Sequence, residues 1–113
     1  MTNPDDIELL DPWWSTKHQS EEFHRSVVKQ LKREIPRGHA LEKVDVRVIA
    51  RGNGDDALFQ LLDGSGRVAT VHLTWQRSRQ KPPWPLTDLF ESLEEWRVKV
   101  MLPDHEEWSG QDE

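Results

Sequence analysis

Two short turns divide residues 43–75 into three apolar segments. The turns read Gly52-Asn53-Gly54-Asp55 and Asp63-Gly64-Ser65-Gly66, and both consist of residues that favour tight turns. The segments around them have the length of strands, and the first alternates apolar with polar side chains. Consecutive strands joined by turns this short pair antiparallel. The sequence therefore predicts a three-stranded antiparallel meander with strands at 43–51, 57–62 and 67–75.

The register of the second hairpin follows from its turn. If Asp63 and Gly66 close the hairpin, Leu58 lies opposite Val71 and Phe59 lies opposite Thr70. Large apolar side chains then occupy both faces of the sheet. Both faces therefore need at least partial cover.

A helix is predicted before the meander. Ser20 is a favoured N-cap residue, and two glutamates follow it in the first turn, where the helix dipole favours acids. Phe23, Val27 and Leu31 recur every four residues, which makes one apolar stripe. Pro36 and Gly38 should end this helix.

A second helix is predicted near the C-terminus. Ser92 and Glu95 form a capping-box pattern, and Trp96 continues the apolar stripe that follows. Pro103 should close this helix, with a shorter acidic segment after it. The predicted fold is α+β: an N-terminal helix, the three-stranded meander, a long proline-rich loop and a C-terminal helix. Trp75 and Trp96 should be buried against the meander.

Composition places these elements in one domain. The chain has 113 residues, no cysteine and a net charge of −6. We expect a single domain over residues 12–108, with a flexible acidic lead at 1–11 and a flexible acidic tail at 109–113. No apolar run is long enough for a membrane span, and the acidic N-terminus does not resemble a signal peptide, so the expected location is the cytoplasm. The negative charge argues against broad binding to DNA or RNA.

The cations of this acidic chain gather in the segment Trp75 to Trp84. Arg77, Arg79 and Lys81 lie between the two tryptophans, and no acid interrupts them. One interpretation is a recognition element in which the tryptophans stack on bases or partner side chains and the cations contact anions. The other is a solvated connector, with Trp75 ending an inward-facing strand and Trp84 fixing the returning loop. In both cases the three cations should be dispensable for folding.

Signals for catalysis and for metal binding are weak. His72 alternates with apolar neighbours and is expected to be a partly buried, hydrogen-bonded structural histidine, although a small enzyme centred on His72 is one alternative function. His105 lacks the second histidine of a zinc-protease motif, since the required position holds Ser109. The sequence contains neither a nucleophile motif nor a phosphate-binding glycine loop. We therefore predict no cofactor and no metal.

Several segments resemble a group of small uncharacterised bacterial proteins. They are Val71-His72-Leu73-Thr74-Trp75, the proline-bounded Pro83-Trp84-Pro85, and Ser92-Leu93-Glu94-Glu95-Trp96. The resemblance covers roughly residues 55–108 and carries no activity with it. Size, acidity and layout are similar to those of immunity proteins and other small inhibitor modules, which is a likeness of class and not of site.

These observations favour a protein-binding module, in its narrower form an immunity or inhibitor protein, with a basic protein as partner. The contact candidates are the acidic ends and the tryptophans Trp13, Trp14 and Trp108. The alternative is a nucleic-acid-associated module that uses the basic aromatic loop 75–84, with Arg77, Arg79, Lys81 and Trp84 as contacts.

Overall fold

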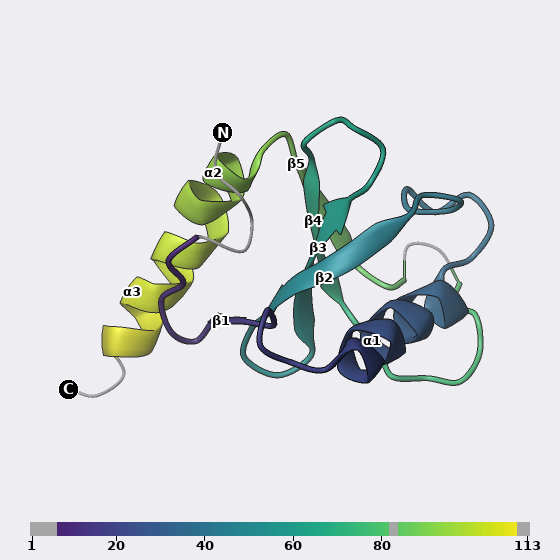
Figure 1. Cartoon of the computed structure of the whole chain (residues 1–113), viewed down its shortest axis with the longest axis horizontal. Helices are drawn as coiled ribbons and strands as arrows, with labels where there is room; N and C mark the ends of the chain where they lie inside the picture. Colours follow the sequence, from purple (N-terminus) through teal and green to yellow (C-terminus); the bar gives the residue numbers. More distant parts are fainter. Residues whose placement is uncertain (1–6, 82–83, 111–113) are drawn as a thin grey trace.

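The computed structural model describes residues 7–81 and 84–110 as one antiparallel sheet covered by helices on both faces (Figure 1). The sheet has five strands in the order β1-β2-β3-β4-β5, so every strand pairs with its neighbour in sequence. In chain order the elements are β1 (Trp14–Ser15), α1 (Glu21–Glu34), β2 (Val46–Arg51), β3 (Asp56–Leu61), β4 (Val68–His72), β5 (Thr87–Phe90), α2 (Leu93–Trp96), the π-helical segment η2 (Arg97–Met101) and α3 (Leu102–Gly110).

The predicted layout of one helix, three strands, a loop and one helix is wrong. A strand, β1, precedes α1, and the supposed proline-rich loop contains the edge strand β5. Both missed strands are short, and neither shows the period-two alternation by which strands are recognised. Their strand geometry depends on pairing with β2 and β4, which sequence pattern alone does not reveal.

Helix α1 forms where its capping signals place it. The Ser20 hydroxyl accepts a hydrogen bond from the backbone N–H of Phe23 at 3.1 Å, which satisfies one of the unpaired donors of the first turn. The helix ends at Glu34, one residue after the basic pair Lys32 and Arg33 and two before Pro36. Its buried face, which includes Val27 and Leu31, lies on the sheet.

The register between β3 and β4 differs by one residue from the predicted one. Ala57 lies opposite Val71 and Leu58 lies opposite Thr70. The connection between the strands is one residue shorter than predicted, because Phe59 lies opposite Ala69 instead of Thr70 and the Leu61 N–H donates to the Arg67 carbonyl at 3.1 Å. A shift of one residue exchanges the partners across the hairpin, so the predicted pairs are replaced throughout.

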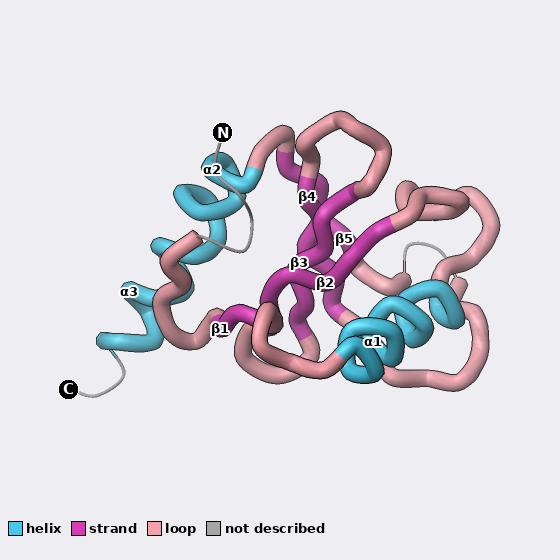
Figure 2. Tube along the Cα trace, viewed as in Figure 1, coloured by secondary structure: helices cyan, strands magenta, loops and turns pink. Residues whose placement is uncertain are grey.

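Two hydrophobic cores lie on the two faces of the sheet. Helix α1 covers the first core, which includes Phe59 and Val71. The C-terminal helical segment formed by α2, η2 and α3 covers the second core, and residues 7–13 run beside this segment (Figure 2). A bulge in β2 after Val48 turns both Ile49 and Ala50 towards the second core. The predicted lead and tail fall partly on residues 1–6 and 111–113, which lie outside the described residues.

A pair of tryptophans forms the centre of the second core. Trp96 is fully buried, as predicted, and Trp13 meets it edge to face with ring centroids 5.1 Å apart and an interplanar angle of 88°. The indole of Trp13 also lies directly over Gly52, where an added Cβ would come within 3.0 Å of the ring. The second core therefore joins the N-terminal segment, the β2–β3 turn and the C-terminal helical segment.

Pro103 does not end the C-terminal helical segment, which corrects the prediction. The segment continues to Gly110, and the π-helical turn of η2 precedes the proline. In that turn the Leu102 N–H donates to the Arg97 carbonyl, five residues back. This wider turn leaves space for Pro103, which has no N–H to donate and whose ring would clash with the preceding turn of an ordinary α-helix. No helix of the described residues is long and apolar enough to cross a membrane.

Replacing Trp96 with alanine should lower the free energy of unfolding by about 3–5 kcal/mol, because it removes one of the two tryptophans at the centre of the second core. The loss comes from packing, since the buried Trp96 Nε1 has no hydrogen-bond partner among the described residues. Urea unfolding measures the change. Val98→Ala, on the same helical segment but 50% exposed, is the matched control and should change stability by no more than about 0.5 kcal/mol. Equal unfolding midpoints for the two variants would contradict the assigned core.

Candidate protein-binding face

The turn between β2 and β3 is fixed by hydrogen bonds from its own strands. The Gly52 N–H donates to the Asp56 carbonyl at 3.0 Å. The side chain of Arg51 reaches across the turn, with Nη2 donating to the Gly54 carbonyl at 3.1 Å and Nε donating to the Asp56 carbonyl at 3.2 Å. These contacts hold Asp55 and Asp56 in set positions at one end of the sheet.

Arg51 also connects this turn to an exposed tryptophan. Its guanidinium carbon lies 5.1 Å from the centroid of the Trp75 ring, within the range of a cation–π contact. Burial lowers the pKa of Arg51, while Asp55 and Asp56 act in the opposite direction. Because the ordinary pKa of arginine is so high, the side chain stays cationic at neutral pH.

Trp75 is half-exposed and not buried, which overturns the prediction made for it. Its side chain is 43% exposed, and its indole Nε1 donates to Asp55 Oδ1 at 2.9 Å. β4 ends at His72, so Trp75 no longer follows the alternation of the strand. The backbone adopts φ = 61°, a left-handed conformation that is unusual for a bulky residue. Such a conformation persists only where the surrounding structure enforces it.

Glu34 supplies that enforcement. Its carboxylate is fully buried at the end of α1 and accepts four hydrogen bonds from uncharged donors. Oε1 accepts from the Thr74 N–H at 2.8 Å and from the Thr74 hydroxyl at 2.7 Å. Oε2 accepts from the Trp75 N–H at 3.0 Å and from Gln30 Nε2 at 2.7 Å. Glu34 therefore fixes the corner at which the chain leaves β4, and with it the position of Trp75.

An acidic hollow of about 220 Å³ lies beside the same turn. Asp104 is oriented there by Trp13, whose indole Nε1 donates to Asp104 Oδ2 at 2.9 Å. Trp108, 41% exposed, forms the aromatic part of the wall. The lining residues are Pro12, Asn53, Asp56, Asp104, Glu107 and Trp108.

The tryptophans predicted as contacts separate into two kinds. Trp13 is 2% exposed and belongs to the core, so it cannot itself touch a partner; its indole instead fixes Asp104. Trp14 is 40% exposed, and in the pairing of β1 with β2 it lies opposite Arg51. Trp75, predicted to be core, joins the exposed group. We call the resulting surface the aromatic–acidic face: Trp14, Asp55, Asp56, Trp75, Asp104, Glu107 and Trp108.

His72 borders this face and is exposed rather than partly buried. Its Nδ1 lies 2.9 Å from Asp56 Oδ1, and because a carboxylate can only accept, Nδ1 is the donor. A histidine oriented by an aspartate is half of a catalytic arrangement. The missing half would be a hydroxyl that His72 could activate as a nucleophile. The nearby hydroxyl of Thr74 instead donates its proton to Glu34. The contacts of His72 thus fit a residue that positions Asp56.

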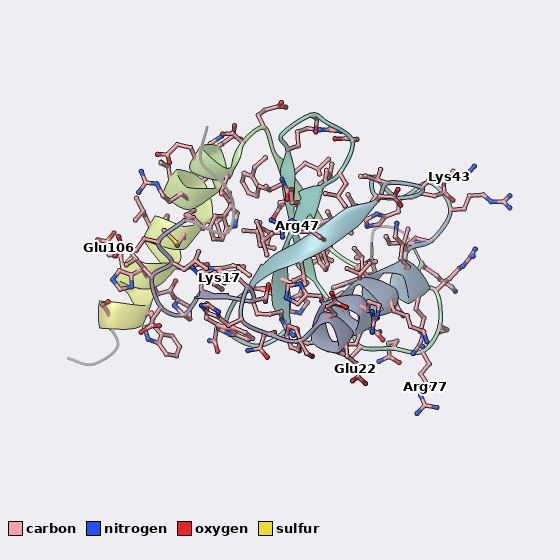
Figure 3. The ribbon with its side chains drawn as sticks, viewed as in Figure 1. Lys17, Glu22, Lys43, Arg47, Arg77 and Glu106 are labelled. Atoms are coloured by element: carbon pink, nitrogen blue, oxygen red, sulfur yellow. The ribbon has the colours of Figure 1, made fainter. Side chains whose placement is uncertain are left out.

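The three cations of the basic loop are not part of this face, although the loop begins at Trp75. Arg77, Arg79 and Lys81 are all exposed, and Arg77 extends into solvent at the periphery (Figure 3). The backbone is fixed to α1, because the Gln80 N–H donates to the Glu34 carbonyl at 2.9 Å. An open hollow of about 640 Å³ lies along the loop. Its lining is Thr74, Gln76, Ser78, Arg79, Gln80, Lys81 and Trp84, so it includes every predicted contact of this loop except Arg77.

Sequence reasoning missed Glu34, Gln30 and Asp104. All three fall on helical positions where polar residues are common, and helical periodicity does not distinguish a buried polar side chain from an exposed one. The sequence contains one weak indication that Glu34 is buried. It lies three residues after Leu31, so it is on the same side of α1 as the apolar stripe. Among the described residues, no three His, Asp or Glu side chains are grouped so as to hold a metal ion.

Replacing Glu34 with glutamine should lower the free energy of unfolding by about 1–3 kcal/mol, because an NH₂ group would then face the donors of Thr74 or Trp75. Urea unfolding measures this change, and trypsin cleavage after Arg77 and Arg79 should become faster as the corner loosens. Glu22→Gln is the control on the same helix, where the carboxylate is exposed (Figure 3), and should change stability by no more than about 0.5 kcal/mol. If the two variants behave alike, Glu34 does not hold the corner.

Comparison with known proteins adds no relative. No protein family, no curated protein and no solved structure matches the chain. The resemblance to small bacterial proteins with a His-Leu-Thr-Trp strand therefore stays a prediction.

Proposed function

We propose that this chain is a small protein-binding module and that the aromatic–acidic face is its contact surface for a basic segment of a partner protein. One observation carries the proposal. Trp14, Trp75 and Trp108, each about two-fifths exposed at 40%, 43% and 41%, lie around a single turn that also bears carboxylates.

Exposed tryptophans of this kind suit tight binding. Tryptophan is among the residues whose truncation costs interfaces most, because it buries a large area with few rotatable bonds. Trp75 is held by its indole hydrogen bond to Asp55 and by the guanidinium of Arg51. Little conformational freedom remains to be lost on binding, which raises the affinity that a given contact area can give.

The carboxylates of the face define the charge of the partner. Asp56, Asp104 and Glu107 converge on the acidic hollow, where a lysine or arginine side chain would also meet the face of Trp108. The net charge of −6 adds a long-range attraction for a basic protein, which speeds association at low ionic strength. An immunity or inhibitor protein is the narrower form of this proposal, supported by the size and acidity of the chain.

A second candidate function uses the basic loop. The hollow beside Arg79, Lys81 and Trp84 offers cations and an aromatic face to a single-stranded nucleic acid. Against this reading stands the net charge, since phosphate neutralisation supplies most of the affinity for nucleic acids.

The experiment compares two tryptophans of nearly equal exposure. The chain is used to capture partners from native lysate, and the affinity of each captured protein is then measured by calorimetry with the parent, Trp108→Ala and Trp84→Ala. Trp108→Ala should weaken binding by about 30-fold, the size expected for a hot-spot residue. Trp84→Ala, 43% exposed against 41% for Trp108, should leave the affinity within about two-fold. Binding should also weaken as salt is added.

The opposite pattern would contradict the proposal. If Trp84→Ala weakens binding and Trp108→Ala does not, the contact lies on the basic loop. If the bound material is removed by nuclease, the partner is a nucleic acid and the second candidate function replaces the first.

A further inference from the structure

A largely apolar groove of about 500 Å³ runs between α1 and β2. Val28 on the helix and Val46 on the strand contribute to its floor, and the alkyl stems of long side chains form its walls. The lining is His24, Arg25, Val28, Lys29, Val46, Arg47 and Val48, none of which belongs to the face proposed above. The groove is thus a second surface, and its function does not depend on the first.

The strand beside this groove is only partly paired on its outer side. On this outer side, β2 pairs with β1 at Ala50 and Arg51. Among the described residues, no strand pairs with β2 on this side at Val46 or Arg47. On the inner side, the Leu62 N–H donates to the Asp45 carbonyl at 2.8 Å, so the backbone of residue 45 faces β3. Because antiparallel strands alternate the direction of their backbone groups, those of Val46 point outward. The neighbouring outward carbonyls are occupied, since that of Val44 accepts from Lys32 Nζ and that of Val48 accepts from Thr16 Oγ1, so the open position on this strand edge is Val46.

The groove is bordered by cations in a chain that is acidic overall. Arg25 and Lys29 lie one helical turn apart on α1, and both are exposed. Arg25 forms an ion pair with Glu21 at 3.7 Å. Because the two side chains are 75% and 93% exposed, water screens this ion pair and it contributes little energy. Arg47 of β2 also lines the groove, but its Nε donates to Gln60 Oε1 at 2.7 Å, so Arg25 and Lys29 supply the charge of the border (Figure 3 labels Arg47). The border therefore favours an anionic occupant.

We propose that this groove binds an extended, acidic segment of a partner protein, which adds to the sheet as a strand beside Val46. An added strand would form main-chain hydrogen bonds with the outward N–H and C=O of Val46. Its side chains alternate, so one set lies over Val28 and the apolar floor while acidic side chains reach Arg25 and Lys29. The occupant is thus an extended peptide with apolar and acidic residues in alternation, the opposite in charge to the partner of the aromatic–acidic face.

The test uses synthetic peptides and the whole chain labelled with ¹⁵N. The probe is an eight-residue peptide of alternating glutamate and valine with blocked ends, and its control replaces each glutamate with lysine. The glutamate peptide should shift the amide signals of Val46 and Arg47 in a saturable way and slow the hydrogen exchange of the Val46 N–H. The lysine peptide should do neither. Equal binding of the two peptides, or saturable binding without protection of Val46, would overturn the proposal.

Charge reversal provides the second arm. The double variant Arg25→Glu, Lys29→Glu should weaken binding of the glutamate peptide at least about ten-fold, equivalent to about 1.4 kcal/mol. The matched control Arg77→Glu reverses an exposed cation outside the groove and should leave that affinity unchanged. Both proteins should unfold at the same urea concentration as the parent, since all three side chains are exposed. An equal loss in the control, or no loss in the double variant, would show that the groove is not the binding site.

Discussion

The burial of Trp13 is the constraint on which most of this structure depends. One indole contacts three segments that are far apart in sequence: it meets Trp96 edge to face, it covers Gly52, and its N–H donates to Asp104. The Gly52 contact leaves no space for a side chain, because the ring lies where a Cβ would be. Moving this indole would therefore displace the β2–β3 turn and the C-terminal helical segment together. The acidic hollow lies where those two elements meet, so its shape follows from a residue inside the core.

A different buried group fixes the other side of the aromatic–acidic face. Glu34 holds the exit of β4 through four hydrogen bonds, and Trp75 takes its left-handed backbone conformation at that exit. Burying a carboxylate is costly unless its lone pairs are satisfied, and here the donors are all neutral. A solvated connector would not need an anchor of this kind. The anchoring of the corner therefore supports a role for the surface that it presents.

Sequence patterns identified the elements whose signals are local. Ser20 and Ser92 cap their helices as predicted, since a cap depends on residues three positions away. The three central strands were located from their turns, but the predicted three-stranded layout was wrong because the sheet has five strands. The register of β3 with β4 was also shifted by one residue, because turn length depends on which residues close the hairpin. β1 and β5 have no local signal and exist through pairing. The burial of Trp13 and the exposure of Trp75 were misjudged for the same reason, since tertiary contacts decide both.

The π-helical turn of η2 determines how the two ends of the C-terminal helical segment are rotated relative to each other. Trp108 follows Trp96 by twelve positions, which in a regular α-helix is roughly three and a third turns. Without η2, the two side chains would point in directions about a third of a turn apart. One extra residue absorbed in a wider turn reduces the separation to nearly three whole turns. The same helical stripe can then place Trp96 in the core and Trp108 in the wall of the hollow. A substitution that turned η2 into an ordinary α-helix without removing a residue would leave the helix intact and rotate its last tryptophan about a third of a turn away from the surface it helps to form.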